Sequence, residues 1–135
     1  MISSEIQLRV NYYETDVMGY VHHSNYIRYF ETARTEMFRK FGISYAAMEA
    51  GGIMMPVIRT ECRYIQPAKF DDLLTICVVM KKMPDTRMNL NYEISNEEKK
   101  KICEGSVELV FINSRSRRPC KAPENVVKIL QAHFV

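Results

Sequence analysis

The stretch YYETDVMGYVHHSNYIRYFETAR, residues 12–34 of this 135-residue chain, holds the side chains whose types and spacing point most directly to chemistry. Asp16 is a potential base or nucleophile, and Gly19 follows where a chain can turn freely. His22 and His23 stand directly before an apolar, helix-like segment. Because the first N–H groups of a helix lack internal partners, this junction can stabilise an oxyanion. A carboxylate beside it is suited to acyl transfer to water.

The same residues also have purely structural interpretations. An aspartate in a turn after a strand commonly accepts hydrogen bonds from nearby backbone N–H groups. Adjacent histidines point in different directions, so they make a poor metal pair, and a histidine near a helix start is commonly solvated. Glu31 lies three residues from both Arg28 and Arg34, which predicts a solvated face of ion pairs. From the residues alone, both interpretations stay open.

Length and composition exclude several classes of protein. With 47% hydrophobic and 26% charged residues, the chain is expected to form one globular domain over residues 1–135. The net charge of +3 is mild, and no basic face with interleaved aromatic residues indicates a nucleic-acid partner. No segment approaches the roughly 20 apolar residues of a membrane span, and the first ten residues carry charges that a signal peptide would not. We therefore expect a cytoplasmic location.

The cysteines predict neither a disulfide framework nor a metal centre. They are widely separated, form no C-x-x-C pair, and have no histidine nearby at metal-ligand spacing. In predicted strands a free cysteine usually behaves as a small buried hydrophobe. The four positions are Cys62, Cys77, Cys103 and Cys120.

Hydrophobic periodicity predicts the elements that position Asp16. Alternation indicates a first strand over Ile6–Tyr12, and spacings of three and four indicate an amphipathic helix from Asn25 to Phe41. Ser24 or Asn25 is expected to cap this helix, and Gly42 suits its end. The remaining predicted elements are a short helix at 44–50, strands at 53–64, 73–83, 87–95 and 101–112, and a terminal helix at 123–134.

This order of elements predicts an antiparallel α+β domain whose last four strands form a meander. The long helix would cover one face of the sheet, with the strands curling around it. A doubly wound parallel fold is a weaker alternative, because it needs helices between successive strands and this chain has only turns there. Pairing with a second copy would remove an exposed sheet edge, so we expect at least a dimer.

The motif D-x-x-G-x-V-x-H-x-x-Y, which begins at Asp16, resembles the opening motif of the 4-hydroxybenzoyl-CoA thioesterase-like branch of the hotdog-fold proteins. It is especially similar to the small acyl-CoA thioesterases associated with the Tol-Pal system. The segments F-G-I-S, E-C-R-Y-I-Q-P-A-K-F-D-D-L-L and R-R-P-C-K-A-P also resemble family counterparts, so the similarity covers nearly the whole chain. It implies an α+β hotdog fold, with a long central helix wrapped by a five- or six-stranded antiparallel sheet, assembled as a homodimer or homotetramer.

The resemblance also implies roles for individual residues in hydrolysing an acyl-CoA thioester. Asp16 would attack the thioester carbon or activate water. The backbone N–H of His23 would polarise the carbonyl while its ring assists, and Tyr12 would lie near the same site. Residues expected to contact the substrate or its CoA phosphates are Gly19, Val21, Arg115, Arg117, Arg118 and Lys121. CoA is then part of the substrate, and no metal or separate cofactor is expected.

Two other functions stay open. One is a hotdog hydratase or dehydratase that acts on acyl-CoA or acyl carrier protein, and the other is a non-catalytic acyl-CoA-binding protein. The acyl group itself, whether aromatic, short or long, does not follow from the sequence.

Overall fold

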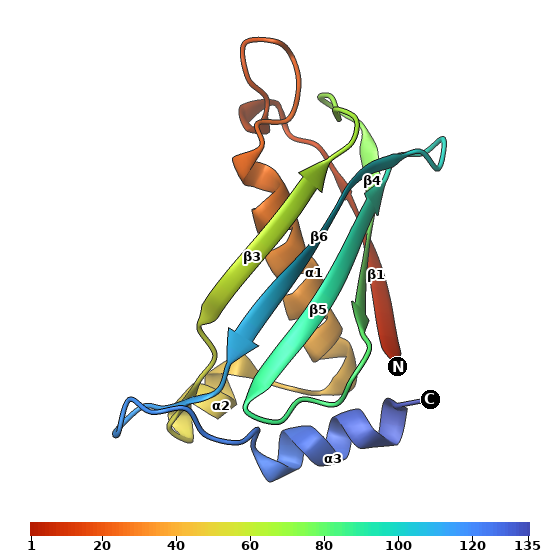
Figure 1. The fold of residues 1–135 in the computed structure, drawn as a ribbon. Coiled ribbons are helices and arrows are strands. Elements are labelled where there is room, and N and C mark those ends of the chain that lie inside the picture. Colours follow the sequence, from red (N-terminus) through yellow and green to blue (C-terminus); the bar gives the residue numbers. More distant parts are fainter.

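A computed structural model describes all 135 residues and shows a curved antiparallel sheet with helices on one side and at one end (Figure 1). The elements in chain order are β1 (Ile2–Arg9), the 3-10 turn η1 (Tyr12–Glu14), α1 (Ser24–Phe41), α2 (Tyr45–Ala50), β2 (Ile53–Met54), β3 (Val57–Tyr64), β4 (Leu73–Met80), β5 (Arg87–Ser95), β6 (Lys101–Val110), β7 (Ile112–Asn113) and α3 (Glu124–His133). The predicted α+β class and the five-stranded antiparallel sheet are confirmed.

The strand order of the main sheet is β1-β4-β5-β6-β3. The predicted four-strand meander is therefore correct only for β4, β5 and β6, because β3 pairs with β6 at the far edge from β1. The predicted strand at 53–64 is also divided. Pro56, which has no N–H to donate, separates β3 from the short β2, and β2 pairs with β7 in a second small sheet. The first strand begins at Ile2 and ends at Arg9, because the chain turns over η1.

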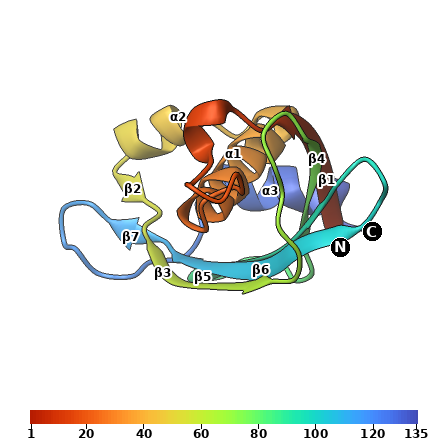
Figure 2. The ribbon, with the colours of Figure 1, turned by 90° about the horizontal axis from the view of Figure 1, so that it is seen from above.

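Helix α1 lies against the concave side of the sheet (Figure 2). Its buried side chains recur at helical spacing: Asn25, Tyr26, Tyr29, Phe30, Ala33, Arg34, Met37 and Phe38. The opposite side of α1, with Arg28 and Thr32, is exposed, and Glu31 is exposed at the edge between the two sides. The curved sheet therefore covers one side of the helix and leaves the other side exposed.

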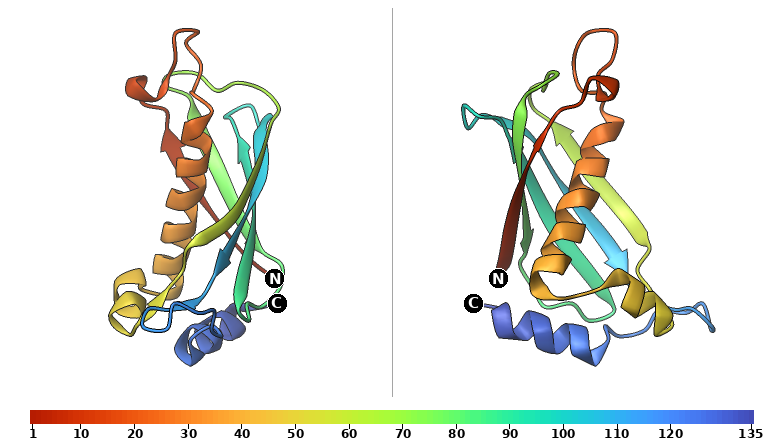
Figure 3. Two further views of the ribbon diagram at one scale, coloured as in Figure 1. Left: turned by 60° about the vertical axis from the view of Figure 1, so that its left-hand side comes forward. Right: turned by 180° about the vertical axis from the view of Figure 1, so that it is seen from behind.

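Helix α3 packs across the end of the sheet where α1 finishes, and the loop that contains Asp16 extends from the other end (Figure 3). Val126 and Leu130 anchor α3 in the core. None of the helices combines the length and the apolar character needed to cross a bilayer. All four cysteines are free, and Cys103 is buried.

Gly105 on β6 lies directly against the side chain of Phe30 from α1. Phe30 of α1 stacks on Tyr92 of β5, with ring centroids 4.4 Å apart, and Tyr92 pairs with Gly105 across the strands. A Cβ atom at position 105 would lie 2.7 Å from the Phe30 ring and also meet the carbonyl oxygen of Glu61. Only glycine leaves room for this packing.

The Gly105→Ala substitution is therefore expected to lower the free energy of unfolding by about 3 kcal/mol. Urea unfolding would measure the change. Ser106→Ala is the matched control, because the neighbouring side chain is on the outer face and should alter stability by less than about 0.5 kcal/mol. Equal midpoints for the two variants would contradict this packing argument.

Candidate active site

Asp16 belongs to the connection between η1 and α1, a loop that extends from one end of the molecule (Figure 1). The two arms of the loop are held by the bridge between Thr15 and Val21 and by the bridge from Tyr20 to Lys69. Gly19 turns the chain with a φ of +80°, in the left-handed region that favours glycine, and its N–H donates to the Asp16 carbonyl at 3.0 Å. The glycine is therefore needed for the turn itself.

The two carboxylate oxygens of Asp16 have different surroundings. Oδ1 accepts the backbone N–H of Met18 at 2.9 Å and that of Tyr20 at 3.3 Å. Oδ2 has no protein partner, and the side chain is exposed. The structural and the catalytic interpretations of this residue are thus compatible, because one oxygen holds the turn and the other is available to a ligand.

The start of α1 presents a free backbone donor. His23 is the residue before the first helical residue, and Ser24 and Asn25 lie inside the helix, so the predicted caps are wrong. The ring of His22 caps the start of the helix instead, because its Nδ1 accepts the Ser24 N–H at 3.3 Å and lies 2.8 Å from the Ser24 hydroxyl. The His23 N–H donates to no protein acceptor. An oxygen ligand can therefore bind there without displacing a protein hydrogen bond.

Asn25 ties the helix start to the chain that leads to Asp16. Its Nδ2 donates to the Glu14 carbonyl at 2.8 Å, and the same carbonyl accepts the His22 N–H at 2.9 Å. The Asn25 side chain is buried. The Tyr29 hydroxyl, one turn further along α1, is buried without a hydrogen-bond partner, and burial together with the nearby Glu14 carboxylate raises the pKa of Tyr29.

We expect Asn25→Ala to loosen this connection. Removing the amide leaves the Glu14 carbonyl with one donor fewer, which should cost about 1–3 kcal/mol of unfolding free energy. The His22 amide should then exchange with solvent faster, and hydrogen exchange followed by NMR would measure this. Thr32→Ala, on the exposed side of α1, is the control. Unchanged exchange at His22 would show that Asn25 does not hold the loop.

Tyr64, the last residue of β3, lies beside His23. Its hydroxyl lies 3.5 Å from the His23 carbonyl oxygen, and its ring centroid is 6.2 Å from that of His23. Tyr26, whose hydroxyl accepts the Ala68 N–H, packs on the other side at 5.5 Å. Sequence reasoning missed Tyr64, because no local pattern shows that this strand ends beside a helix start 41 residues earlier.

The other predicted site residues are more scattered. Tyr12 lies in η1, is 71% exposed, and packs against Phe70 with centroids 5.6 Å apart. The Val21 side chain belongs to the buried core, so only its backbone faces the loop. Arg115, Arg117, Arg118 and Lys121, here called the basic loop, connect β7 to α3 beside α2, at the end of the molecule opposite Asp16 (Figure 1).

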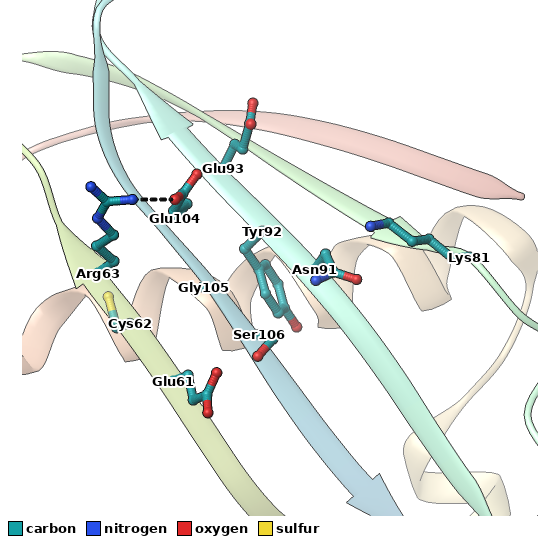
Figure 4. Close-up of a pocket in the computed structure, with 10 residues that line it drawn as sticks. All are labelled: Glu61, Cys62, Arg63, Lys81, Asn91, Tyr92, Glu93, Glu104, Gly105 and Ser106. Atoms are coloured by element: carbon teal, nitrogen blue, oxygen red, sulfur yellow. Dashed lines mark hydrogen bonds and ion pairs between the residues drawn. The ribbon is translucent and has the colours of Figure 1, made fainter.

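A separate hollow lies on the outer face of the sheet, over β3, β6 and β5 (Figure 4). Its charged side chains point to solvent, and Arg63 pairs with Glu104 at 3.5 Å. It lies on the side of the sheet away from α1, and none of its lining residues belongs to the Asp16 loop. No three His, Cys, Asp or Glu side chains gather as a metal site. The loop at the start of α1 is therefore the better candidate for chemistry.

Known protein families show which class of protein this chain belongs to. Residues 10–130 match the family model described as the Thioesterase-like superfamily. The chain belongs to this superfamily. The match confirms the resemblance drawn from the Asp16 motif, and it places the protein among the thioesterases as a class of enzyme.

Individual members of the thioesterase-like superfamily are similar over nearly their full length. The acyl-CoA thioester hydrolase YbgC of Escherichia coli is 32% identical over 120 residues, which cover 89% of this chain and 90% of that protein. A 1,4-dihydroxy-2-naphthoyl-CoA hydrolase of Synechococcus is 27% identical, covering 97% of this chain and 91% of that protein. The crystal structure of a DHNA-CoA thioesterase from Staphylococcus aureus superposes with a TM-score of 0.91 at 30% identity, covering 98% of this chain and 91% of that one.

Proposed function

We propose that the protein hydrolyses an acyl-CoA thioester to a carboxylic acid and free CoA at the start of α1. The observation that carries the proposal is the pairing of two unused groups on one short segment, the Oδ2 atom of Asp16 and the N–H of His23. One is a base or nucleophile and the other an oxyanion donor, which are the two groups that acyl transfer to water needs. Family membership favours the same reaction.

In the proposed reaction, the thioester carbonyl oxygen accepts the His23 N–H, where the helix dipole favours the negative charge that develops on it. Asp16 Oδ2 takes a proton from water as the water oxygen bonds to the carbonyl carbon. The C–S bond then breaks, and the thiolate of CoA leaves and is protonated. In the nucleophilic form, Oδ2 itself bonds to the carbon, the C–S bond breaks and the CoA thiolate leaves, and water then cleaves the resulting anhydride to the free acid and the Asp16 carboxylate.

We further propose that the protein works as a dimer joined along β3. The two edges of the sheet differ, because the exposed residues of β1 are polar, whereas β3 and the residue after it also expose large apolar side chains, two at each end of the strand with charged residues between them. Those side chains are Val57, Ile58, Tyr64 and Ile65. An apolar edge strand is suited to pairing with a second copy, which would extend the sheet and cover them.

A two-fold β3 pairing would also complete the site. β3 runs from Val57, near α2, to Tyr64, near His23. Antiparallel pairing of two copies therefore brings the α2 end of one subunit beside the Asp16 end of the other. The basic loop, far from Asp16 in its own subunit, would then lie near the partner's site. Its guanidinium and ammonium groups suit the phosphates of CoA.

Released thiol, measured across a panel of aromatic, short-chain and long-chain acyl-CoAs, tests the proposed activity. Release from at least one substrate is the expected result. Loss of a double-bond absorbance without thiol release would instead favour a hydratase or dehydratase. Tight binding with no turnover across the panel would favour a non-catalytic acyl-CoA-binding protein.

A further inference from the structure

Arg34 is a buried cation without an acidic partner. Its side chain is on the covered side of α1, and the residue is 7% exposed. Nε donates to the Tyr45 hydroxyl at 3.1 Å, and Nη1 donates to the Tyr92 hydroxyl at 3.3 Å. None of the ion pairs in the protein includes Arg34, not even one with Glu31, the partner that the sequence suggested. The expectation of a solvated ion-pair face is wrong at this residue.

This arrangement leaves some of the hydrogen-bond donors of the Arg34 guanidinium unused. A guanidinium has five N–H donors, and these two hydrogen bonds use two of them. Burial raises the pKa of Tyr45 and raises that of Tyr92 to about 12, so both phenols are neutral at pH 7. The positive charge is therefore not neutralised, and a buried charge without a counter-charge is costly. An oxygen ligand that accepted the remaining donors would lower this cost.

The position of Arg34 relates it to the candidate site. Ile27, Glu31 and Arg34 follow His23 at spacings of four, four and three, so they form one flank of α1 that begins at the free N–H. Ile27 is exposed, as are Ile58 and Tyr64 on β3. His23 and Arg34 are eleven residues apart, which at about 1.5 Å per residue separates them by roughly 16 Å along the helix axis. Because helical side chains tilt toward the helix start, the Arg34 guanidinium is expected about 10–14 Å from the His23 N–H.

We propose that Arg34 binds an oxygen acceptor at the far end of the acyl group and so determines substrate specificity. This rests on the proposed function, because it takes the thioester carbonyl to be held at the His23 N–H. An acyl group that runs along the Ile27 flank places its distal end near the guanidinium. The preferred substrates then carry a carboxylate or a hydroxyl oxygen about 10 Å or more from the thioester carbon. An acyl group that ends in a methyl leaves the guanidinium without a partner.

A purely structural Arg34 would behave differently. If it served only to hold α2 to the sheet through Tyr45 and Tyr92, its loss would weaken binding of all ligands alike. A specificity residue changes the ratio between ligands that differ only at the distal end. The test therefore measures that ratio.

The probes are non-hydrolysable S-(2-oxoalkyl)-CoA compounds of equal chain length that end in a methyl, a hydroxyl or a carboxylate group. Calorimetry on the full-length protein should show at least about 10-fold tighter binding of one oxygen-ended ligand than of the methyl-ended one. Whichever oxygen ligand binds tighter identifies the group that is recognised. In Arg34→Met, the affinities for the oxygen-ended and methyl-ended ligands should differ by no more than about 2-fold, because the methionine side chain is long but has no hydrogen-bond donor.

Tyr45→Phe is the matched control, since it removes a hydrogen bond of Arg34 but keeps the charge and the preference. Arg34→Lys keeps a positive charge but lacks the planar guanidinium, so its ratio of affinities should lie between those of the wild type and Arg34→Met. This variant also provides a test if Arg34→Met does not fold. The wild-type ratio alone decides the outcome if neither folds. No preference in the wild type, the same preference in Arg34→Met, or an equal loss for all three ligands would overturn the proposal.

Failure of the specificity proposal can be told from failure of the proposed function, because the binding ratio needs no turnover. Thiol release without an oxygen preference would reject the role of Arg34 and keep the hydrolase. A clear oxygen preference without thiol release from any matching thioester would keep the binding role and reject the hydrolase.

Discussion

Replacing Asp16 with Asn is expected to lower kcat for thioester hydrolysis by about 10²–10⁴-fold while leaving the protein folded. The amide oxygen of Asn can still accept the N–H groups of Met18 and Tyr20, so the turn is kept. What is lost is an oxygen that can take a proton or attack the carbonyl carbon. Thiol release from the best substrate of the panel measures the rate, and a urea unfolding curve measures the fold.

Two further variants separate chemistry from structure. Asp16→Ala removes the hydrogen bonds of the turn as well as the carboxylate, so it should lose stability in addition to rate. Glu97→Gln removes an exposed carboxylate from the β5–β6 connection, which forms no hydrogen bond or ion pair with the Asp16 loop, and should match the parent rate. If folded Asp16→Asn turned over at the parent rate, Asp16 would be only a turn residue.

The elements of the fold were largely predictable because each follows from local periodicity. The apolar stripe of α1 and the alternation of apolar and polar residues in β4, β5 and β6 can be recognised without knowledge of the rest of the chain. The placement of β3 did not follow, because strand order depends on pairing between distant segments, and consecutive strands are only usually neighbours. For the same reason Tyr64 beside His23 could not be foreseen.

At the candidate site, the motif predicts Asp16 and His23, which the structure places on one short segment before α1, whereas the expectation of a solvated Arg34 is wrong. Spacing shows that Glu31 and Arg34 share a flank of the helix, but it does not show which part of that flank α2 and β5 cover. Burial of Arg34 depends on Tyr45 and Tyr92, which come from two later elements. A charged residue on a helix is usually solvated, so the exception is visible only in three dimensions.

The distribution of charge in one subunit leaves the proposed reaction incomplete. The free groups of Asp16 and His23 lie at one end, and the basic loop that suits CoA phosphates lies at the other. CoA bound with its thioester at His23 would have to reach a phosphate site on the same subunit across the length of α1. Pairing along β3 removes this difficulty, because it places the partner's basic loop beside the thioester. The site is then composite, and this can be tested by exchanging subunits.

Mixing two inactive variants is expected to restore activity. One variant is Asp16→Asn, and the other carries alanine at the four residues of the basic loop. In a heterodimer with composite sites, one site combines Asp16 of the loop variant with the basic loop of the Asp16 variant, while the other site has neither. Random exchange makes half of the dimers heterodimers, so about a quarter of the wild-type rate should return at low substrate concentration. Thiol release after subunit exchange measures it.

The control is the same mixture assayed before exchange, which should give only the average of the two parent rates. Should each basic loop serve Asp16 of its own subunit, every site in the heterodimer would still carry one defect. Exchange would then add nothing, and this result would reject the composite site. The experiment does not depend on how severe either defect is, provided both parents are well below the wild-type rate. It separates the subunit arrangement from the role of Asp16, because recovery requires Asp16 and the basic loop to act together from different chains.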